Sequence, residues 1–121
     1  MPTYTHQTEN TRTGAPGMEF PSAPQEWTPA HARDQAAREK LDLTTDHWVV
    51  ISALQEYYAK TEEIDRNMRQ MHDMLEERFH AKGGMKYLYG LFPGGPIAQG
   101  CRLAGLKAPA IAVDKGFGSV A

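Results

Sequence analysis

The most reactive side chain in the sequence is that of Cys101, the single cysteine among 121 residues. A thiolate is a strong nucleophile, and nearby cations favour it by lowering the thiol pKa. Arg102 and Lys107 stand close by in sequence, as does the N-terminus of a helix that we predict over residues 96–104. In that helix Cys101 shares the apolar face with Ile97, which is also where a small buried cysteine belongs. The residues alone therefore leave open a reactive thiol and a core cysteine.

A second group of side chains has metal-ligand chemistry. His72, Glu76 and His80 recur at four-residue spacing along a helix that we predict over residues 62–81. Imidazole nitrogens and carboxylate oxygens are ligands that zinc accepts. Three ligands spread along one helix do not converge on one ion without a loop or a second helix, so we interpret them as a solvated face. We predict no metal and no organic cofactor.

The composition is that of one small globular domain. Hydrophobic residues make up 40% of the chain, charged residues 23%, and the formal net charge is -2. No apolar run approaches the ~18 residues that span a bilayer, and the N-terminus lacks the regions of a signal peptide. One cysteine excludes a disulfide within the chain. We therefore expect a cytoplasmic protein without membrane insertion.

The charge is unevenly distributed along the chain. Residues 1–77 hold seven Lys and Arg and fourteen Asp and Glu, whereas residues 78–113 hold five Lys and Arg and no acid. A basic C-terminal third is typical of a surface for an anionic partner, and equally of a solvated mixed surface. Because predicted helices and glycine turns follow one another here, a helix-turn-helix unit that binds DNA is one alternative.

The hydrophobic pattern predicts a mostly α-helical fold, a small bundle of about five helices. Thr28 and Pro29 are a typical helix start, as is Thr44 or Thr45. Apolar residues from Ile64 to Phe79 repeat at helical spacing. The expected helices cover residues 29–40, 44 or 45 to at least 58, 62–81, 85–91 and 96–104.

The ends of the chain differ from its middle. Residues 1–17 are poor in large apolar side chains, so we expect a loosely ordered segment, with Met18 to Phe20 as a short strand. Residues 18–106 form the expected helical domain. Residues 107–121 are the expected C-terminal arm and extension.

A long motif near the C-terminus resembles a known family. The segment KYLYGLFPGGPIAQGCRLAGL, residues 86–106, is similar to the C-terminal signature of the DsrC/TusE family, which includes the gamma subunit of dissimilatory sulfite reductase. Upstream, residues 43–48 resemble the family's L-T-x-x-H-W helix start, residues 56–58 its E-Y-Y, and Trp27 its N-terminal tryptophan. The resemblance extends over roughly residues 18–113.

The resemblance implies a helical domain with a helix-turn-helix-like core, a short N-terminal β-hairpin and a flexible C-terminal arm. It also implies sulfur metabolism, in which the family carries sulfur between protein partners on cysteines. Cys101 matches the upstream cysteine of the family and is the candidate persulfide acceptor. The family surface for a sulfite-reductase-like or sulfur-relay partner falls on Lys86, Tyr87, Tyr89, Arg102 and Lys107.

The sequence departs from the family at the arm. The arm's penultimate cysteine falls on position 112, which is Ala112, and the chain continues past Val113, where the family normally ends. A methyl group can neither hold a persulfide nor form a disulfide with Cys101. We therefore expect a non-catalytic adaptor or regulator that binds a sulfur-metabolism partner. The alternatives are a carrier with a persulfide on Cys101, which would be a sulfurtransferase-type activity, and the DNA-binding regulator.

Overall fold

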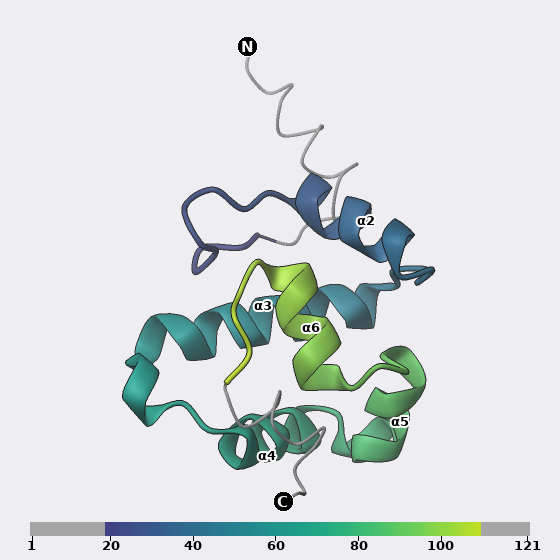
Figure 1. Ribbon diagram of the computed structural model, residues 1–121. Helices are drawn as coiled ribbons and strands as arrows, with labels where there is room; N and C mark the ends of the chain where they lie inside the picture. Colours follow the sequence, from purple (N-terminus) through teal and green to yellow (C-terminus); the bar gives the residue numbers. More distant parts are fainter. Residues whose placement is uncertain (1–18, 110–121) are drawn as a thin grey trace, which may run out of the picture.

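The fold is a bundle of five α-helices with two short 3-10 turns, seen in the computed structural model of residues 19–109 (Figure 1). No β-strand occurs among these described residues. The mostly helical prediction is therefore confirmed. The elements in chain order are α2 (Pro29–Arg38), α3 (Thr45–Lys60), η1 (Glu63–Asp65), α4 (Met68–Arg78), η2 (His80–Lys82), α5 (Gly84–Leu91) and α6 (Pro96–Ala104).

Helix α6 lies at the centre of the bundle. It crosses α3, with α2 on one side and α4 and α5 on the other (Figure 1). Seven of its nine residues are buried, and the other two, Ala98 and Arg102, are four residues apart on one face. The last helix within residues 19–109 is thus the core of the fold.

Close packing of α6 on α3 depends on a glycine. A β-carbon placed on Gly100 would lie 2.7 Å from Cδ1 of Leu54 and 3.5 Å from Cγ1 of Val50. Both neighbours are fully buried, so they have little room to withdraw. Glycine at this position lets the two helices approach closely.

The helix starts follow the expected capping chemistry. The Thr28 side chain accepts a hydrogen bond from the His31 amide at 3.3 Å, and Pro29 takes the first helical position. Asn67 caps α4 by accepting from the Gln70 amide at 2.8 Å. These side chains satisfy amide groups that have no partner within their own helix.

His47 joins the start of α3 to the end of α5. Its Nδ1 accepts from the Thr44 amide at 2.9 Å, and its Nε2 lies 2.8 Å from the Leu91 carbonyl. That pairing requires a proton on Nε2 and a neutral ring. Burial lowers the pKa of His47, which favours the same neutral form.

The helix predicted over residues 62–81 is broken at both ends. Thr61 and Arg66 are extended, η1 forms a single 3-10 turn between them, and α4 begins only at Met68. The Arg66 guanidinium donates to the Tyr58 and Thr61 carbonyls at 2.9 and 2.8 Å, so a side chain ends α3. Ile64, expected in the apolar seam, is 87% exposed.

The C-terminal end of the same prediction is also too long. Helix α4 ends at Arg78, and η2 follows as one 3-10 turn. Gly83 and Gly84 then take φ angles of +124° and +63°, which turn the chain into α5. The apolar seam itself is confirmed, since Met71, Leu75 and Phe79 are buried.

Several predictions about the chain ends lie outside the described residues. These are the loose segment 1–17 and the part of the predicted arm, residues 107–121, that follows residue 109. For the strand at Met18 to Phe20, the described part, Glu19 and Phe20, is not a strand. Phe20 instead packs its ring on Trp27 and Trp48, with ring centroids 5.0 and 5.8 Å away.

Candidate functional site

Cys101 lies on the buried side of α6 with no exposed surface. Its thiol donates a long hydrogen bond, 3.9 Å, to the hydroxyl oxygen of Tyr58 on α3. The expected position on the apolar face is therefore observed. Cys101 is the sixth residue of α6, well past the N-terminus whose partial charge would favour a thiolate.

The environment of Cys101 disfavours the thiolate. Burial raises the pKa of the Cys101 thiol to about 11, and the Tyr58 hydroxyl and the Arg102 charge, which act in the opposite direction, do not offset it. The thiol is therefore protonated near neutral pH. In this closed arrangement it is a poor nucleophile.

The chain after α6 runs back along the bundle as a strap, residues 105–109, drawn in yellow in Figure 1. Gly105 begins it in the left-handed conformation, with φ of +78°. The Leu106 amide donates to the Cys101 carbonyl at 2.8 Å. The Tyr58 hydroxyl donates to the Lys107 carbonyl at 2.5 Å. Tyr58 thus contacts both the cysteine and the strap.

Tyr58 is itself held from the other side. The Arg66 guanidinium lies over its ring, 4.2 Å from the ring centroid, while bonding the Tyr58 carbonyl. Burial raises the pKa of the Tyr58 hydroxyl, so it stays protonated and remains a donor. Arg66 and Tyr58 together form a fixed support beneath the strap.

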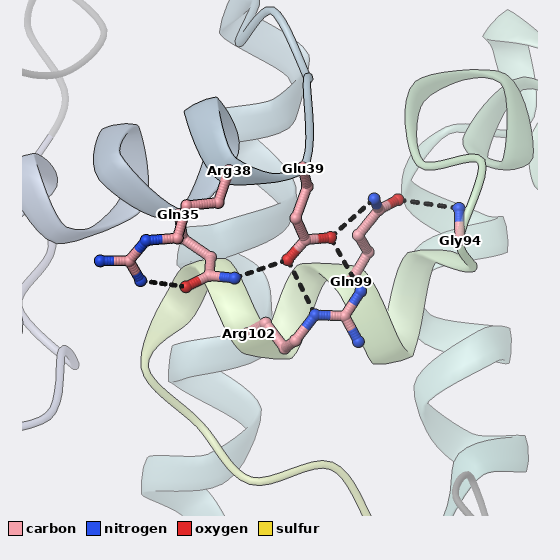
Figure 2. A network of polar contacts seen from close by, with 6 residues as sticks. All are labelled: Gln35, Arg38, Glu39, Gly94, Gln99 and Arg102. Atoms are coloured by element: carbon pink, nitrogen blue, oxygen red, sulfur yellow. Dashed lines mark hydrogen bonds and ion pairs between the residues drawn. The ribbon is translucent and has the colours of Figure 1, made fainter.

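Arg102 is paired with Glu39 at the end of α2 (Figure 2). Two of its nitrogens donate to the two carboxylate oxygens at 2.8 Å each. Gln35 and Gln99 also donate to Glu39 at 2.8 Å, and Gln99 accepts from the Gly94 amide at 2.9 Å. The network lowers the pKa of Glu39 to about 2. It ties α2 to both α6 and the turn before α6.

A second ion pair links α3 to the α4–α5 region. Asp46 accepts from Lys82 at 2.9 Å and from the Tyr87 hydroxyl. These contacts lower the pKa of Asp46. Two cations of the basic segment 78–113, Lys82 and Arg102, are thus paired with acids of the N-terminal half of the chain. Part of the charge asymmetry thus stabilises the fold.

The residues predicted to bind a partner come from α5, from α6 and from the strap. Lys86 and Tyr89 are one turn apart on α5 and are exposed, Tyr89 by 48%. Tyr87 bonds Asp46 of α3, and Arg102 bonds Glu39 at the end of α2. Lys107 is exposed on the strap.

The polar stripe on α4 has a structural use. Glu76 accepts from the Met85 amide at 2.8 Å and so caps the start of α5, and its other oxygen lies 3.9 Å from Nδ1 of His80. Within residues 19–109, no group of three or more His, Cys, Asp or Glu side chains is placed to hold a metal ion. In the same range no helix is long and apolar enough to cross a membrane.

The structure offers little to the DNA-binding alternative. In a helix-turn-helix the second helix must present side chains to the major groove. In α6 only Arg102 is exposed, and its guanidinium is committed to Glu39. Helix α6, the recognition helix in this alternative, therefore has no free exposed polar side chain for base contacts.

Sequence reasoning missed three important polar residues. Tyr58 was only part of an E-Y-Y match, and Glu39 and Asp46 were ordinary charges on predicted helices. Each is paired over more than 35 residues of sequence. No local signal in the chain indicates such long-range partners.

Comparisons with known proteins place the chain in a family. Residues 8–113 match the family described as DsrC like protein, so Ala112 is the last residue but one of the match. Sulfurtransferase TusE of Buchnera aphidicola is 35% identical over 85 residues, which cover 69% of this chain and 74% of that protein. A sulfurtransferase TusE homolog of Haemophilus influenzae is 36% identical over 86 residues, covering 71% and 79%.

Sulfurtransferase TusE of Salmonella typhimurium is 33% identical over 84 residues, which cover 69% of this chain and 77% of that protein. No solved structure gives a significant match. The family match, residues 8–113, contains all the helices described above. The resemblance seen in the C-terminal motif is thus confirmed over most of the sequence, and the chain belongs to the DsrC-like family.

Proposed function

We propose that this chain is an adaptor or regulator that binds a sulfur-relay or sulfite-reductase-like protein and does not itself transfer sulfur. The closed state of Cys101 carries the proposal, because its side chain has no exposed surface and its pKa is raised to about 11. Ala112 supports it, because a methyl group cannot replace the arm cysteine. We place this activity in the cytoplasm, where a lone thiol stays reduced.

The binding surface that we propose includes the exposed side of α5. Lys86 and Tyr89 are exposed there, and tyrosine is enriched among the residues that contribute most to binding at protein interfaces. Lys107 on the strap adds a second exposed cation. Tyr87 and Arg102, which are occupied within the fold, hold neighbouring elements in place rather than contact the partner directly.

The experiment is a binding measurement with purified sulfur-relay proteins and sulfite reductase of the source organism. We expect wild type and Cys101→Ala to bind one of them with equal affinity, because the thiol is internal. Lys86→Glu and Tyr89→Ser should weaken binding about tenfold each. Arg33→Glu is the matched control, since Arg33 is exposed on α2 and outside the proposed surface. Failure of the wild-type chain to bind any of these proteins would exclude the adaptor role.

A single-cysteine carrier is the second candidate, favoured by the retained Cys101 and by relatives named sulfurtransferase. It requires thiolate attack on a donor persulfide, which transfers one sulfur atom to Cys101 and releases the donor thiol. Intact mass after incubation with a persulfide donor distinguishes the two. A stable gain of one sulfur atom that is absent in Cys101→Ala would favour the carrier.

A further inference from the structure

The end of α6 and the strap are attached to the body in different ways. The Trp27 indole donates to the Leu103 carbonyl at 2.8 Å, and the Gln55 amide donates to the Ala104 carbonyl at 3.0 Å. Both donors are buried, and both bonds lie before Gly105. The chain is therefore fixed firmly up to the last residue of α6.

Beyond Gly105 the attachments are few. Leu106 and Ala108 are partly buried against the core, and the Leu106 amide bonds back to α6. The bond from the Tyr58 hydroxyl to the Lys107 carbonyl is the one side-chain hydrogen bond to residues 105–109 in the described structure. A segment with so few contacts opens locally at lower free energy than the body to which it is attached.

Tyr58 places this weakly held segment next to the buried thiol. Its hydroxyl accepts from Cys101 and donates to Lys107, so the strap, the tyrosine and the cysteine form one hydrogen-bonded chain. We propose that the strap is a cover for Cys101 that opens locally, and that the bond between the Tyr58 hydroxyl and the Lys107 carbonyl is its latch. The left-handed Gly105 is the point about which the cover turns.

The proposal predicts a change in thiol reactivity with an unusual sign. In Tyr58→Phe the ring still fills its place and only the hydroxyl is lost. The direct effect of that loss on Cys101 is to raise its pKa further, which slows alkylation. Release of the latch has the opposite effect, because it increases the fraction of molecules in which Cys101 is open. Faster alkylation therefore reports the strap and not the thiol's electrostatics.

The experiment measures alkylation of Cys101 by iodoacetamide in the native full-length protein. We expect Tyr58→Phe to react about three- to tenfold faster than wild type, the change produced by losing one ordinary hydrogen bond from a local opening equilibrium. Tyr57→Phe is the matched control. Tyr57 is adjacent and its hydroxyl also makes hydrogen bonds, to Gln70 and the Asn67 amide, but it does not contact the strap.

Unfolding must be separated from local opening. The alkylation rate is therefore measured at several low urea concentrations, where a local opening responds weakly and global unfolding steeply. Equal rates for Tyr58→Phe and wild type, or an equal acceleration by Tyr57→Phe, would overturn the proposal. A steep urea dependence in wild type would also overturn it, because the thiol would then be reached only by unfolding.

A second variant covers the case in which Tyr58→Phe fails to fold. Leu106→Ala reduces the strap's packing on the core while the Tyr58 hydroxyl stays in place, and it should also accelerate alkylation. An unchanged rate in that folded variant would overturn the proposal. None of these outcomes depends on a binding partner, so the latch and the proposed adaptor function are tested separately.

Discussion

Helix α6 and the strap that follows it are consecutive in sequence but opposite in how they are held. Seven of nine residues of α6 are buried, and the helix is held by the side chains of Glu39 at the end of α2 and of Gln55 on α3, and by the Gly94 amide of the turn before it. The strap has the partly buried Leu106 and Ala108 and a single side-chain hydrogen bond, from Tyr58.

The difference shows how a small domain can combine a stable core with a weakly held cover. The family signature spans α5, the turn and α6, and its buried positions gather in α6, where seven of nine residues are buried. Packing at that density makes single changes costly. Changes in the strap should instead alter access to Cys101 at little cost to the fold.

The largest expected effect on stability comes from removing Trp27, which holds the end of α6. Trp27→Ala removes a buried ring that packs beside Gly105 and bonds the Leu103 carbonyl, and should lower the free energy of unfolding by about 3–5 kcal/mol. Urea denaturation followed by circular dichroism measures it. Trp27→Phe keeps most of the packing and should cost clearly less. Equal stability of Trp27→Ala and wild type would contradict the central place of α6.

The junction between the two regions gives the next effect. Gly105 has φ of +78°, and a β-carbon there would lie 2.8 Å from Cδ1 of the buried Trp27. Gly105→Ala should therefore lower the free energy of unfolding by about 1–3 kcal/mol. Gly90→Ala is the matched control, since a β-carbon on this α5 glycine meets nothing within 4 Å. The control should be neutral or gain about 0.5–1 kcal/mol from better helix propensity.

The hydrogen bonds and ion pair that Glu39 makes with α6 should make the free energy of unfolding depend on pH. The pKa of Glu39 is about 2 in the folded state, against an ordinary value of 4.5. Its contribution is therefore fully present above pH 4.5 and is lost as the pH falls toward 2. Arg102 is about half exposed, so solvent screening reduces the effect. We expect Glu39→Gln to cost about 1–2 kcal/mol at pH 7.

Denaturation curves measured from pH 7 to pH 2 test this assignment. The stability of wild type should approach that of Glu39→Gln as the pH falls toward 2, because Glu39 is then increasingly protonated in the folded state. Both proteins should still lose stability at acidic pH because of His47. Burial lowers the pKa of His47, so the unfolded chain takes up a proton first and stability falls as the pH drops below about 6.5. Parallel curves would show that Glu39 is not responsible.

Much of the helical fold could be predicted from sequence because local rules agree there. Helix α6 was predicted with its observed bounds, since a glycine and proline start and a glycine stop surround an apolar run. The prediction of one helix over residues 62–81 was wrong at its start, where side-chain hydrogen bonds to the backbone override the apolar periodicity. The Arg66 side chain bonds the carbonyl of Tyr58 in the last turn of α3 and that of Thr61 just after the helix, and Asn67 caps the start of α4. Ile64 fitted the seam in sequence but lies in the turn between them.

The site was predicted less completely than the fold, for a physical reason. Helical spacing places Cys101 on an apolar face, and that prediction is confirmed. Spacing does not show that Tyr58 would contact the thiol from 43 residues away, or that Arg102 would turn toward Glu39. Nearby cations in sequence suggested an activated thiol, yet burial dominates its pKa. Charge proximity along the chain is a poor guide when the side chains diverge in space.

The smallest expected effect on stability and thiol access comes from Lys107, and it distinguishes the role of its carbonyl from that of its side chain. The Tyr58 latch bonds the carbonyl of Lys107, which every residue type supplies, and the Lys107 side chain is exposed. Lys107→Ala should therefore change stability by less than about 0.5 kcal/mol and leave Cys101 alkylation as slow as in wild type. The same variant removes a cation from the proposed partner surface, so binding should weaken while the cover stays closed. Faster alkylation in Lys107→Ala would mean that the side chain, and not the carbonyl, holds the strap.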